Sequence, residues 1–340
     1  MTRARLVARI RLPTPGGGSV ALWCGDGVEG IRRRGPYDAI VTSPPYNLRQ
    51  PYRTYRDRRP REEYLDWIGS FADAAASALA PDGSLFLNVG SVPRDPWLAW
   101  DVARRVGERL VLQNVLHWVK SIAIDRALVG RESGVGRDLA LGHYRPVASR
   151  RYVHGAHEYV FHFTRTGRVP IDRLALGVPY QDASNRRRWR GGGLGRRCRG
   201  NVWFLPYATI QGRATDRPHP ATFPPELPAW CLRLHGLGRV RRWADPFVGI
   251  GASAVAASRL GGAAFDGFDI DPVYLAVALA RVRRLVAEGA DGAAGLRPTA
   301  PSAPDRSRAA GSTAGSGASG RLRPGRGGSG CRSSRSVRRR

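Results

Sequence analysis

A short segment, Thr-Ser-Pro-Pro-Tyr-Asn at residues 42–47, combines residue types that could bind and polarise a planar amino compound. It ends an apolar run over residues 37–42 that is typical of a strand. Pro44 and Pro45 fix their φ angles and carry no N–H, so the carbonyls of Ser43 and Pro44 point outward as acceptors. The ring of Tyr46 follows at once. Acceptors beside an aromatic face suit a planar group with an exocyclic NH2, although an isolated Pro-Pro-Tyr is more commonly an ordinary turn.

A second segment, Asp-Pro-Phe-Val-Gly-Ile-Gly-Ala-Ser at residues 245–253, lies between an expected strand and an expected helix. Gly249 and Gly251 would let a ligand approach the backbone, and the start of a helix offers free N–H groups. Asp269 ends the next expected strand, 18 residues beyond Gly251. A carboxylate at this place in a βαβ unit holds ribose hydroxyls. The two features together predict a nucleotide site, whereas the glycines alone would indicate only a tight connection.

Strand-like and helix-like runs alternate around these segments, which predicts an α/β fold with a largely parallel sheet. The expected strands cover residues 19–24, 37–42, 84–89, 111–119, 158–164, 240–244 and 263–270. The expected helices cover residues 62–80, 96–110, 226–235, 252–260 and 272–287. Both chemical segments would then lie at the carboxyl ends of strands, where open α/β sheets bind ligands. Arg241 and Arg242 are unusual in such a central strand, because buried guanidinium groups need partners or solvent.

The net charge of +28, from 55 Lys and Arg against 27 Asp and Glu in 340 residues, makes nucleic acid the default partner. Lys120 is the only lysine, so GC-rich coding could account for part of this arginine excess. No apolar run is long enough to span a bilayer as a helix, which predicts a soluble protein with no membrane partner.

The cysteines and histidines show no spacing typical of a metal site or a disulfide framework. The four cysteines are scattered, with no Cys-x-x-Cys pair, which fits a reducing compartment. His157-Glu158 is followed by Tyr-Val-Phe-His, so the His-Glu-x-x-His pattern is absent. The sequence therefore predicts no metal.

The two ends of the chain differ in composition from its centre. Residues 1–17 are basic and contain Pro13 and Pro15 but no long apolar run, which favours an irregular leader over a secretory signal. Residues 289–340 are mostly Gly, Ser, Ala, Pro and Arg, and such a segment buries too little apolar surface to order itself. We expect a disordered basic tail there, either simply solvated or holding DNA, and a catalytic domain over residues 18–288.

The two chemical segments, taken in order, resemble a known family: the permuted, β-class site-specific DNA methyltransferases that methylate an exocyclic amino nitrogen. In that family a TSPPY-like motif precedes a DPFxGxG motif, as it does here. The resemblance extends over most of residues 18–288 and includes GSLFLNVGS from Gly83, HEYVFHFTR from His157 and FDIDPVYLAVALARV from Phe268. It implies a circularly permuted Rossmann-like fold for S-adenosylmethionine-dependent methyl transfer, with helices on both faces of the sheet. The order differs from amino methyltransferases that act on protein glutamine and from most that act on RNA.

The resemblance also implies roles for single residues. The methyl donor S-adenosylmethionine would lie against five residues of the second segment and its partner strand: Asp245, Phe247, Gly249, Gly251 and Asp269. Asp26 and residues 220–223 would complete that site. Ser43, Pro44, Pro45 and Tyr46 would form the catalytic pocket for a base flipped out of double-stranded DNA. Methyl transfer would be direct, because none of the four cysteines follows a proline as in the carbon-5 cytosine enzymes.

Three functions stay open at this point. In this family a Ser-Pro-Pro-Tyr motif is usual for cytosine N4 and an Asp-Pro-Pro-Tyr motif for adenine N6, with exceptions both ways, so Ser43 favours cytosine. The second candidate is an adenine-N6 methyltransferase. The third is a DNA-binding protein whose catalytic site has decayed, which the intact motifs disfavour.

Two arginine-rich segments are candidates for DNA contacts. Arg49 and Arg53 follow the catalytic motif, where the family has a loop that closes over the substrate. Arg186, Arg187, Arg188 and Arg190 lie in the expected target-recognition insertion, about residues 166–215. Arginines in such interfaces mostly touch phosphate, and a solvated loop is the alternative. The family further implies a cognate restriction endonuclease as a possible partner, or an orphan enzyme, in the cytoplasm of a bacterium or archaeon or from a virus.

Overall fold

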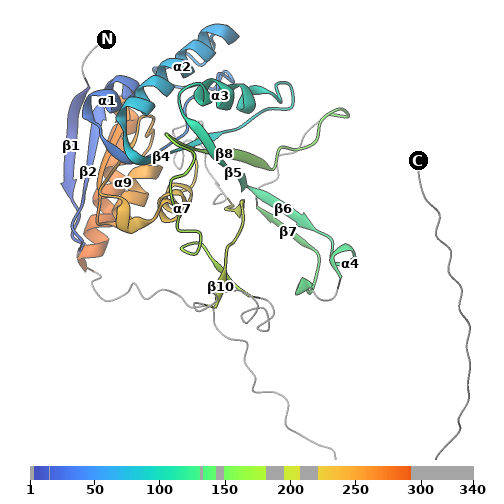
Figure 1. Cartoon of the computed structure of the whole chain (residues 1–340). Coiled ribbons are helices and arrows are strands. Elements are labelled where there is room, and N and C mark those ends of the chain that lie inside the picture. The colour runs from blue at the N-terminus through green and yellow to red at the C-terminus, as the bar shows by residue number, and fades with distance from the viewer. Residues whose placement is uncertain are drawn as a thin grey trace, which may run out of the picture. The chain divides into compact units, whose positions relative to one another are not determined.

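A computed structural model describes residues 4–14, 16–130, 133–142, 149–180, 195–206 and 221–291. Within these residues the central element is a nine-stranded sheet (Figure 1). In order across the sheet, its strands are β1 (Arg5–Arg11), β2 (Ser19–Cys24), β13 (Ala264–Asp269), β12 (Arg242–Asp245), β3 (Tyr37–Thr42), β4 (Leu79–Val89), β8 (His157–Thr164), β5 (Val111–Val119) and β11 (Val202–Phe204).

The centre of the sheet is parallel, and antiparallel pairs lie on both sides of it. Strands β2, β13, β12, β3 and β4 all run parallel to their neighbours in this order. Strand β1 pairs antiparallel with β2, and β8 pairs antiparallel with both β4 and β5. The predicted α/β fold with a largely parallel sheet is confirmed. Strands β12 and β13, late in the chain, lie between β2 and β3, so the second chemical segment meets the first.

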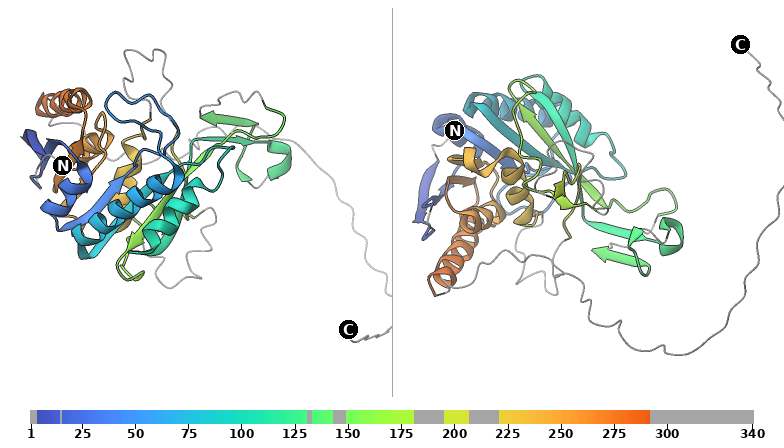
Figure 2. Two further views of the ribbon diagram at one scale, coloured as in Figure 1. Left: turned by 90° about the horizontal axis from the view of Figure 1, so that it is seen from above. Right: turned by 60° about the horizontal axis from the view of Figure 1, so that its bottom comes forward.

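Helices cover both faces of the sheet (Figures 1 and 2). One face carries the first three helices and the other carries the last three, and each group packs into its own hydrophobic core. The first group is α1 (Gly27–Arg34), α2 (Arg61–Ala78) and α3 (Leu98–Gly107), and the second is α7 (Glu226–His235), α8 (Ala252–Leu260) and α9 (Pro272–Asp291). None of these helices in the described part of the chain is long and apolar enough to cross a membrane.

Apolar spacing explains most of these helices. In α2 the buried side chains include Tyr64, Ile68, Phe71 and Ala75, which recur at helical intervals on one face. Helix α1 was not expected, since GVEGIRRR has only two large apolar residues. Its signal is Asp26, whose carboxylate accepts hydrogen bonds from the N–H groups of Val28 and Glu29 and caps the helix.

The prediction of an irregular leader over residues 1–17 is wrong for residues 5–11, which form strand β1. Ala8 and Ile10 are half-buried while Arg9 and Arg11 are exposed, so the segment alternates with the period of a strand that has one covered face. Pairing with β2 satisfies its backbone groups along one edge. The segment therefore extends the sheet.

The expected insertion over residues 166–215 is partly built into the domain. Strand β11 lies inside it and pairs parallel with β5, and Trp203 of that strand is buried in the core. Two short strands, β9 (Val178–Pro179) and β10 (Arg196–Arg197), form a separate pair. A second small sheet, β6 (Ser121–Ile124) and β7 (Leu139–Gly142), flanks helix α4 (Arg126–Val129) and stands away from the main sheet (Figures 1 and 2).

Arg242 in the central strand β12 has partners, which resolves the expected cost of an arginine there. Its guanidinium donates to the buried carboxylate of Asp266 at 2.6 and 3.1 Å and lies over the ring of Tyr37. Asp266 also accepts from the indole of Trp23 at 2.9 Å and the hydroxyl of Tyr37 at 3.1 Å. The carboxylate thereby joins β2, β3, β12 and β13.

A buried serine bridges two histidines between the sheet and helix α7. Ser84 of β4 is 2.9 Å from His162 Nε2 of β8 and 2.9 Å from His235 Nδ1 of α7. Burial lowers the pKa of His162 to about 3 and that of His235 to about 4. Both rings are therefore neutral near pH 7 and hold together the strands that carry Asn88 and Glu158.

We expect this cluster to make stability depend on pH. The pKa of His162 is about 3 in the folded protein and about 6.5 in the unfolded chain. Between these values only the unfolded chain is protonated at this residue, so stability is lost as the pH falls below 6.5. Relative to His162→Gln, the wild type should lose about 2 kcal/mol of unfolding free energy between pH 7.5 and pH 5. Urea denaturation at both pH values measures this difference. A difference that stays constant would contradict a neutral His162.

Candidate active site

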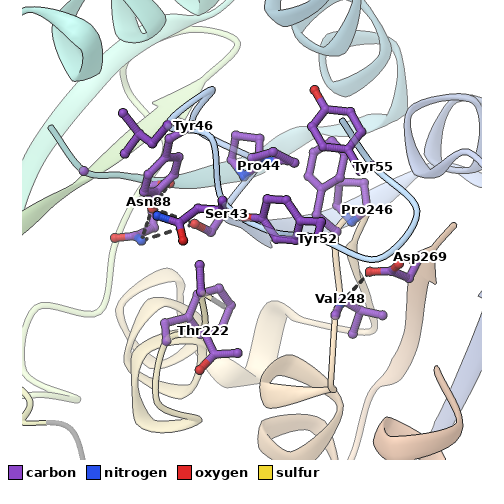
Figure 3. A pocket seen from close by; sticks show the side chains of 18 of the residues that line it. Ser43, Pro44, Tyr46, Tyr52, Tyr55, Asn88, Thr222, Pro246, Val248 and Asp269 are labelled. Atoms are coloured by element: carbon purple, nitrogen blue, oxygen red, sulfur yellow. Dashed lines mark hydrogen bonds between the residues drawn. The ribbon is translucent and has the colours of Figure 1, made fainter. Parts of the chain in front are cut away.

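A single cavity of about 580 Å³ opens where the parallel strands end (Figure 3). Each of five neighbouring strands delivers residues to its wall: Asp26 follows β2, Ser43 follows β3, Asn88 is the last but one residue of β4, Pro246 follows β12 and Asp269 ends β13. This is the edge at which open α/β sheets bind ligands, and the volume lies in the range of small-molecule sites. Both chemical segments thus face one space.

One end of the cavity is a cluster of hydroxyl, amide and carboxylate groups around Tyr46. The Tyr46 hydroxyl lies 2.7 Å from Ser43 Oγ and 3.1 Å from Glu158 Oε2. Asn88 Nδ2 donates to Tyr46 Oη at 2.8 Å and to Glu158 Oε2 at 2.8 Å. Its other amide atom, Oδ1, is buried without a hydrogen-bond partner among the described residues. Figure 3 shows Ser43, Tyr46 and Asn88 converging on this end.

Three residues of this end were missed by the sequence reasoning: Asn88, Glu158 and Lys120. Lys120 Nζ lies 3.0 Å from Glu158 Oε1, and both side chains are largely buried. Each residue lies at or next to the end of a strand, and the antiparallel register of β8 with β4 and β5 brings the three together. A polar residue near the end of an otherwise apolar strand, such as Asn88, could have indicated a site residue. The register of β8 against β4 and β5 could not be predicted from the sequence.

The other end of the cavity is built around Asp269. Its Oδ2 accepts from the Gly249 N–H at 2.9 Å, and its Oδ1 accepts from the Asp271 N–H at 2.8 Å. Burial raises the pKa of Asp269 to about 6 despite these hydrogen bonds. The carboxylate is therefore ionised above that pH and can accept hydrogen bonds from ligand hydroxyls.

Asp245 does not line the cavity but supports both ends of it. Its side chain is fully buried and accepts from Thr42 Oγ1 at 2.6 Å, Ser253 Oγ at 2.6 Å and the Phe247 N–H at 3.0 Å. Burial raises the pKa of this carboxyl to about 6. The hydrogen bonds fix the ends of β3 and β12 and the start of α8 to one another.

The two glycines of the second segment have different roles. Gly249 has φ +52° and lines the cavity, where its N–H holds Asp269. Gly251 has φ +86° and is not one of the residues that line the cavity; a Cβ there would be 2.6 Å from Cβ of Ala278 on α9. Gly251 is therefore required for close packing of two helices.

A loop over residues 47–60 forms a further wall of the cavity. The buried carboxylate of Asp57 accepts from the N–H groups of Asn47, Leu48 and Gln50 at 2.9 to 3.1 Å, which shapes the start of the loop. Tyr52 and Tyr55 extend from it over the cavity (Figure 3). The loop thus places aromatic faces between the two ends.

The predicted DNA contacts lie outside the cavity or outside the described residues. Arg53 Nε lies 3.4 Å from Asp271 Oδ2, which ties the loop to the start of α9. Arg49 is exposed and lines a separate pocket of about 400 Å³ beside Tyr46, together with Arg58, Arg59 and Arg61. Arg186, Arg187, Arg188, Arg190, Pro220 and the tail from residue 292 lie outside the described residues.

The remaining predicted residues lie on the cavity wall. They are Asp26, Ser43, Pro44, Pro45, Tyr46, Phe247, and residues 221–223. Among the residues that the structure describes, no three His, Cys, Asp or Glu side chains gather as metal ligands would. The cavity therefore offers hydrogen-bond acceptors at both ends and an aromatic and apolar middle, which suits two ligands bound end to end.

Comparison with known proteins relates this arrangement to a family. The family model N6_N4_Mtase, described as DNA methylase, matches residues 37–280. The Type II methyltransferase M.BglII of Bacillus subtilis is 26% identical over 253 residues, which cover 71% of this chain and 62% of that protein. The Type II methyltransferase M.MjaVI of Methanocaldococcus jannaschii is 48% identical over 52 residues, 15% of this chain and 27% of that protein.

A solved structure shares the fold. The PvuII DNA methyltransferase (cytosine-N4-specific) superposes with a TM-score of 0.52 at 19% identity, covering 80% of this chain and 93% of that one. The chain spans less than two thirds of the length of M.BglII, whereas the family match takes in both chemical segments and more than half of the chain. The resemblance found in the motifs is therefore confirmed: this chain belongs to the N6_N4_Mtase family of DNA methylases.

Proposed function

We propose that the protein is a site-specific DNA methyltransferase that transfers a methyl group from S-adenosylmethionine to the exocyclic N4 of cytosine. The observation that carries the proposal is the shared cavity, in which Ser43 and Tyr46 face the same space as Asp269. A methyl donor at one end and a flipped base at the other would meet in the middle. Related proteins named Type II methyltransferases support DNA as the substrate.

The donor end fits S-adenosylmethionine. The Asp269 carboxylate is held by two backbone N–H groups, so its remaining lone pairs can accept the two ribose hydroxyls. Asp26, Phe247 and Gly249 line the same end, and the N-terminus of α1 lies next to Asp26. When bound, the donor supplies a methyl group on a positively charged sulfur. Asp245 and Gly251 act indirectly, by fixing the loop and the helices around it.

The target end suits an aromatic amine. The lone pair of an exocyclic amino nitrogen is delocalised into its ring, which makes the nitrogen a poor nucleophile. Ser43 Oγ and the carbonyl of Pro44 would accept hydrogen bonds from its N–H groups and draw the nitrogen toward tetrahedral geometry, while Tyr46 stacks on the base. The nitrogen would then attack the methyl carbon as the carbon–sulfur bond breaks and the electron pair of that bond stays on the sulfur of S-adenosylhomocysteine. The nitrogen would lose one proton to water.

Cytosine is favoured over adenine on two grounds. Ser43 occupies the first position of the catalytic motif, and the PvuII enzyme that shares the fold is a cytosine-N4-specific DNA methyltransferase. Adenine N6 remains the alternative with the same fold and residue roles. A decayed enzyme that only binds DNA is disfavoured because Ser43, Tyr46 and Asp269 line one cavity.

Double-stranded DNA would approach beside the catalytic loop. Arg49 and Arg58 are exposed next to Tyr46 and could contact phosphates that flank the flipped base. We also infer recognition by the arginines at positions 186–190, a cognate restriction endonuclease as a possible partner, and a cytoplasmic location.

The product identifies the target base. The purified protein is incubated with S-adenosylmethionine carrying a labelled methyl and with unmethylated genomic DNA, and the DNA is digested to nucleosides for mass spectrometry. We expect N4-methylcytosine. N6-methyladenine would overturn the choice of base, and no methylated base despite tight DNA binding would overturn the enzymatic function.

Replacing Asp269 tests the donor end. Asp269→Asn keeps the shape but removes a charged acceptor, so the affinity for S-adenosylmethionine should fall by about tenfold or more. Isothermal titration calorimetry measures this affinity. Asp73→Asn, at an exposed residue of α2, is the matched control and should bind like the wild type. Equal affinity of both variants for S-adenosylmethionine would contradict a contact between the donor and Asp269.

Replacing two arginines tests the DNA approach. Arg49→Gln combined with Arg58→Gln should weaken DNA binding and make the dependence of log affinity on log salt concentration shallower by about 2. Fluorescence anisotropy at several salt concentrations measures both. Arg283→Gln, at an exposed position of α9, is the control. An unchanged slope in the double variant would exclude these arginines from the interface.

A further inference from the structure

We propose that Glu158 is a positioning residue: through the Tyr46 hydroxyl it turns the Ser43 hydroxyl proton away from the cavity. Ser43 Oγ then presents lone pairs, and no proton, to the amino group of the target base. The inference rests on the proposed function and adds a role for a residue outside both sequence motifs. The hydrogen bonds around Tyr46 and Glu158 support it in three steps.

The first step concerns the single proton of Tyr46. Glu158 Oε2 at 3.1 Å and the main-chain carbonyl of Asn88 at 3.2 Å are both acceptors only, so the Tyr46 hydroxyl donates toward them. Asn88 Nδ2, at 2.8 Å, is a donor only. A carboxylate is the strongest acceptor in this group. The Tyr46 proton is therefore directed to Glu158, and Tyr46 Oη is an acceptor on its other side.

The second step concerns Ser43. Its Oγ lies 2.7 Å from Tyr46 Oη, a distance at which one of the two hydroxyls must donate. Because the Tyr46 proton points to Glu158, the donor is Ser43. Asn88 Nδ2 makes only a long contact of 3.4 Å to Ser43 Oγ, since its two protons are directed at Tyr46 and Glu158 at 2.8 Å each. The lone pairs of Ser43 Oγ are left for the cavity that Ser43 lines.

The third step concerns the anchoring of Glu158. Lys120 Nζ holds Oε1 at 3.0 Å, and Asn88 Nδ2 holds Oε2 at 2.8 Å, so the carboxylate has a fixed orientation with Oε2 toward Tyr46. The exposed fractions of the Glu158 and Lys120 side chains are 15% and 21%. In such a partly dry site, a charged acceptor orders neighbouring hydroxyls more strongly than it would in water. Three strands, β4, β5 and β8, contribute to this order.

The consequence is a defined effect of Glu158→Gln. The amide that replaces the carboxylate can donate to Tyr46, which would let the Tyr46 proton turn to Ser43 and make Ser43 Oγ a poorer acceptor for the amino group. Because this hydrogen bond strengthens as the amino nitrogen becomes positive in the transition state, kcat should fall by about tenfold or more. The KM values for DNA and S-adenosylmethionine should change by less than about threefold.

A double-mutant cycle separates this role from simple support of the fold. Tyr46→Phe keeps the ring but removes the hydroxyl that links Glu158 to Ser43. In the Tyr46→Phe background, Glu158→Gln should cause no further loss of kcat, whereas independent roles would multiply the two losses. Additive losses would overturn the proposal. Glu226→Gln, an exposed residue paired with Arg259 on α8, is the control for loss of one charge.

A readout that needs no activity completes the test. Neutron diffraction from crystals of the deuterated protein locates hydroxyl deuterium atoms directly. We expect the Ser43 deuterium to point at Tyr46 Oη and the Tyr46 deuterium to point at Glu158. A Tyr46 deuterium directed at Ser43 would overturn the proposal. If the wild type transfers no methyl group, the proposed function fails, and the neutron structure still decides the orientation of Ser43.

Discussion

The hydrogen bond from Thr42 to Asp245 is the interaction on which the site depends. These residues are 203 positions apart in the chain, and the bond of 2.6 Å joins the last residue of β3 to the last residue of β12. Asp245 is fully buried, so the loss of either partner hydroxyl would leave a desolvated carboxylate short of a donor. Asp245 also accepts from Ser253, so it fixes the position of residues 42–47 relative to the glycine turn and α8.

The strand order gives this bond its importance. Because β12 and β13 are inserted between β2 and β3, the sheet brings together two halves of a site that are far apart in the sequence. In the parallel centre of the sheet, the carboxyl ends of five strands lie at one edge. Strand β8 runs antiparallel, so its first residues, including Glu158, lie at the same edge. A purely parallel sheet would have delivered the other end of β8. The mixed topology therefore adds a carboxylate to a site otherwise built by parallel strands.

Helices and strands whose bounds depend on local sequence patterns were predicted correctly. The strand at residues 37–42 and helices at residues 226–235 and 252–260 were expected with the same bounds, because apolar periodicity and proline or glycine mark their ends. Long-range register was out of reach, so Asn88, Glu158 and Lys120 were missed. Asp245 and Gly251 were expected to touch the ligand. Neither lines the cavity, and their types also satisfy burial of Asp245 and close helix packing at Gly251. An isolated motif does not distinguish these needs from ligand binding, so their contact with a ligand stays a prediction.

The network also bears on why a serine suffices at position 43. At the Tyr46 end of the cavity the negative charge resides on Glu158, one hydroxyl beyond Ser43, and Lys120 balances it. A carboxylate at position 43 would stand close to that of Glu158 in a partly dry site, and two like charges there would repel each other. The hydroxyl of Ser43 is neutral and avoids this repulsion. Tyr46 orients the Ser43 proton through hydrogen bonds while the negative charge stays on Glu158. We infer that the identity of residue 43 and the charge at residue 158 are coupled through the Tyr46 hydroxyl.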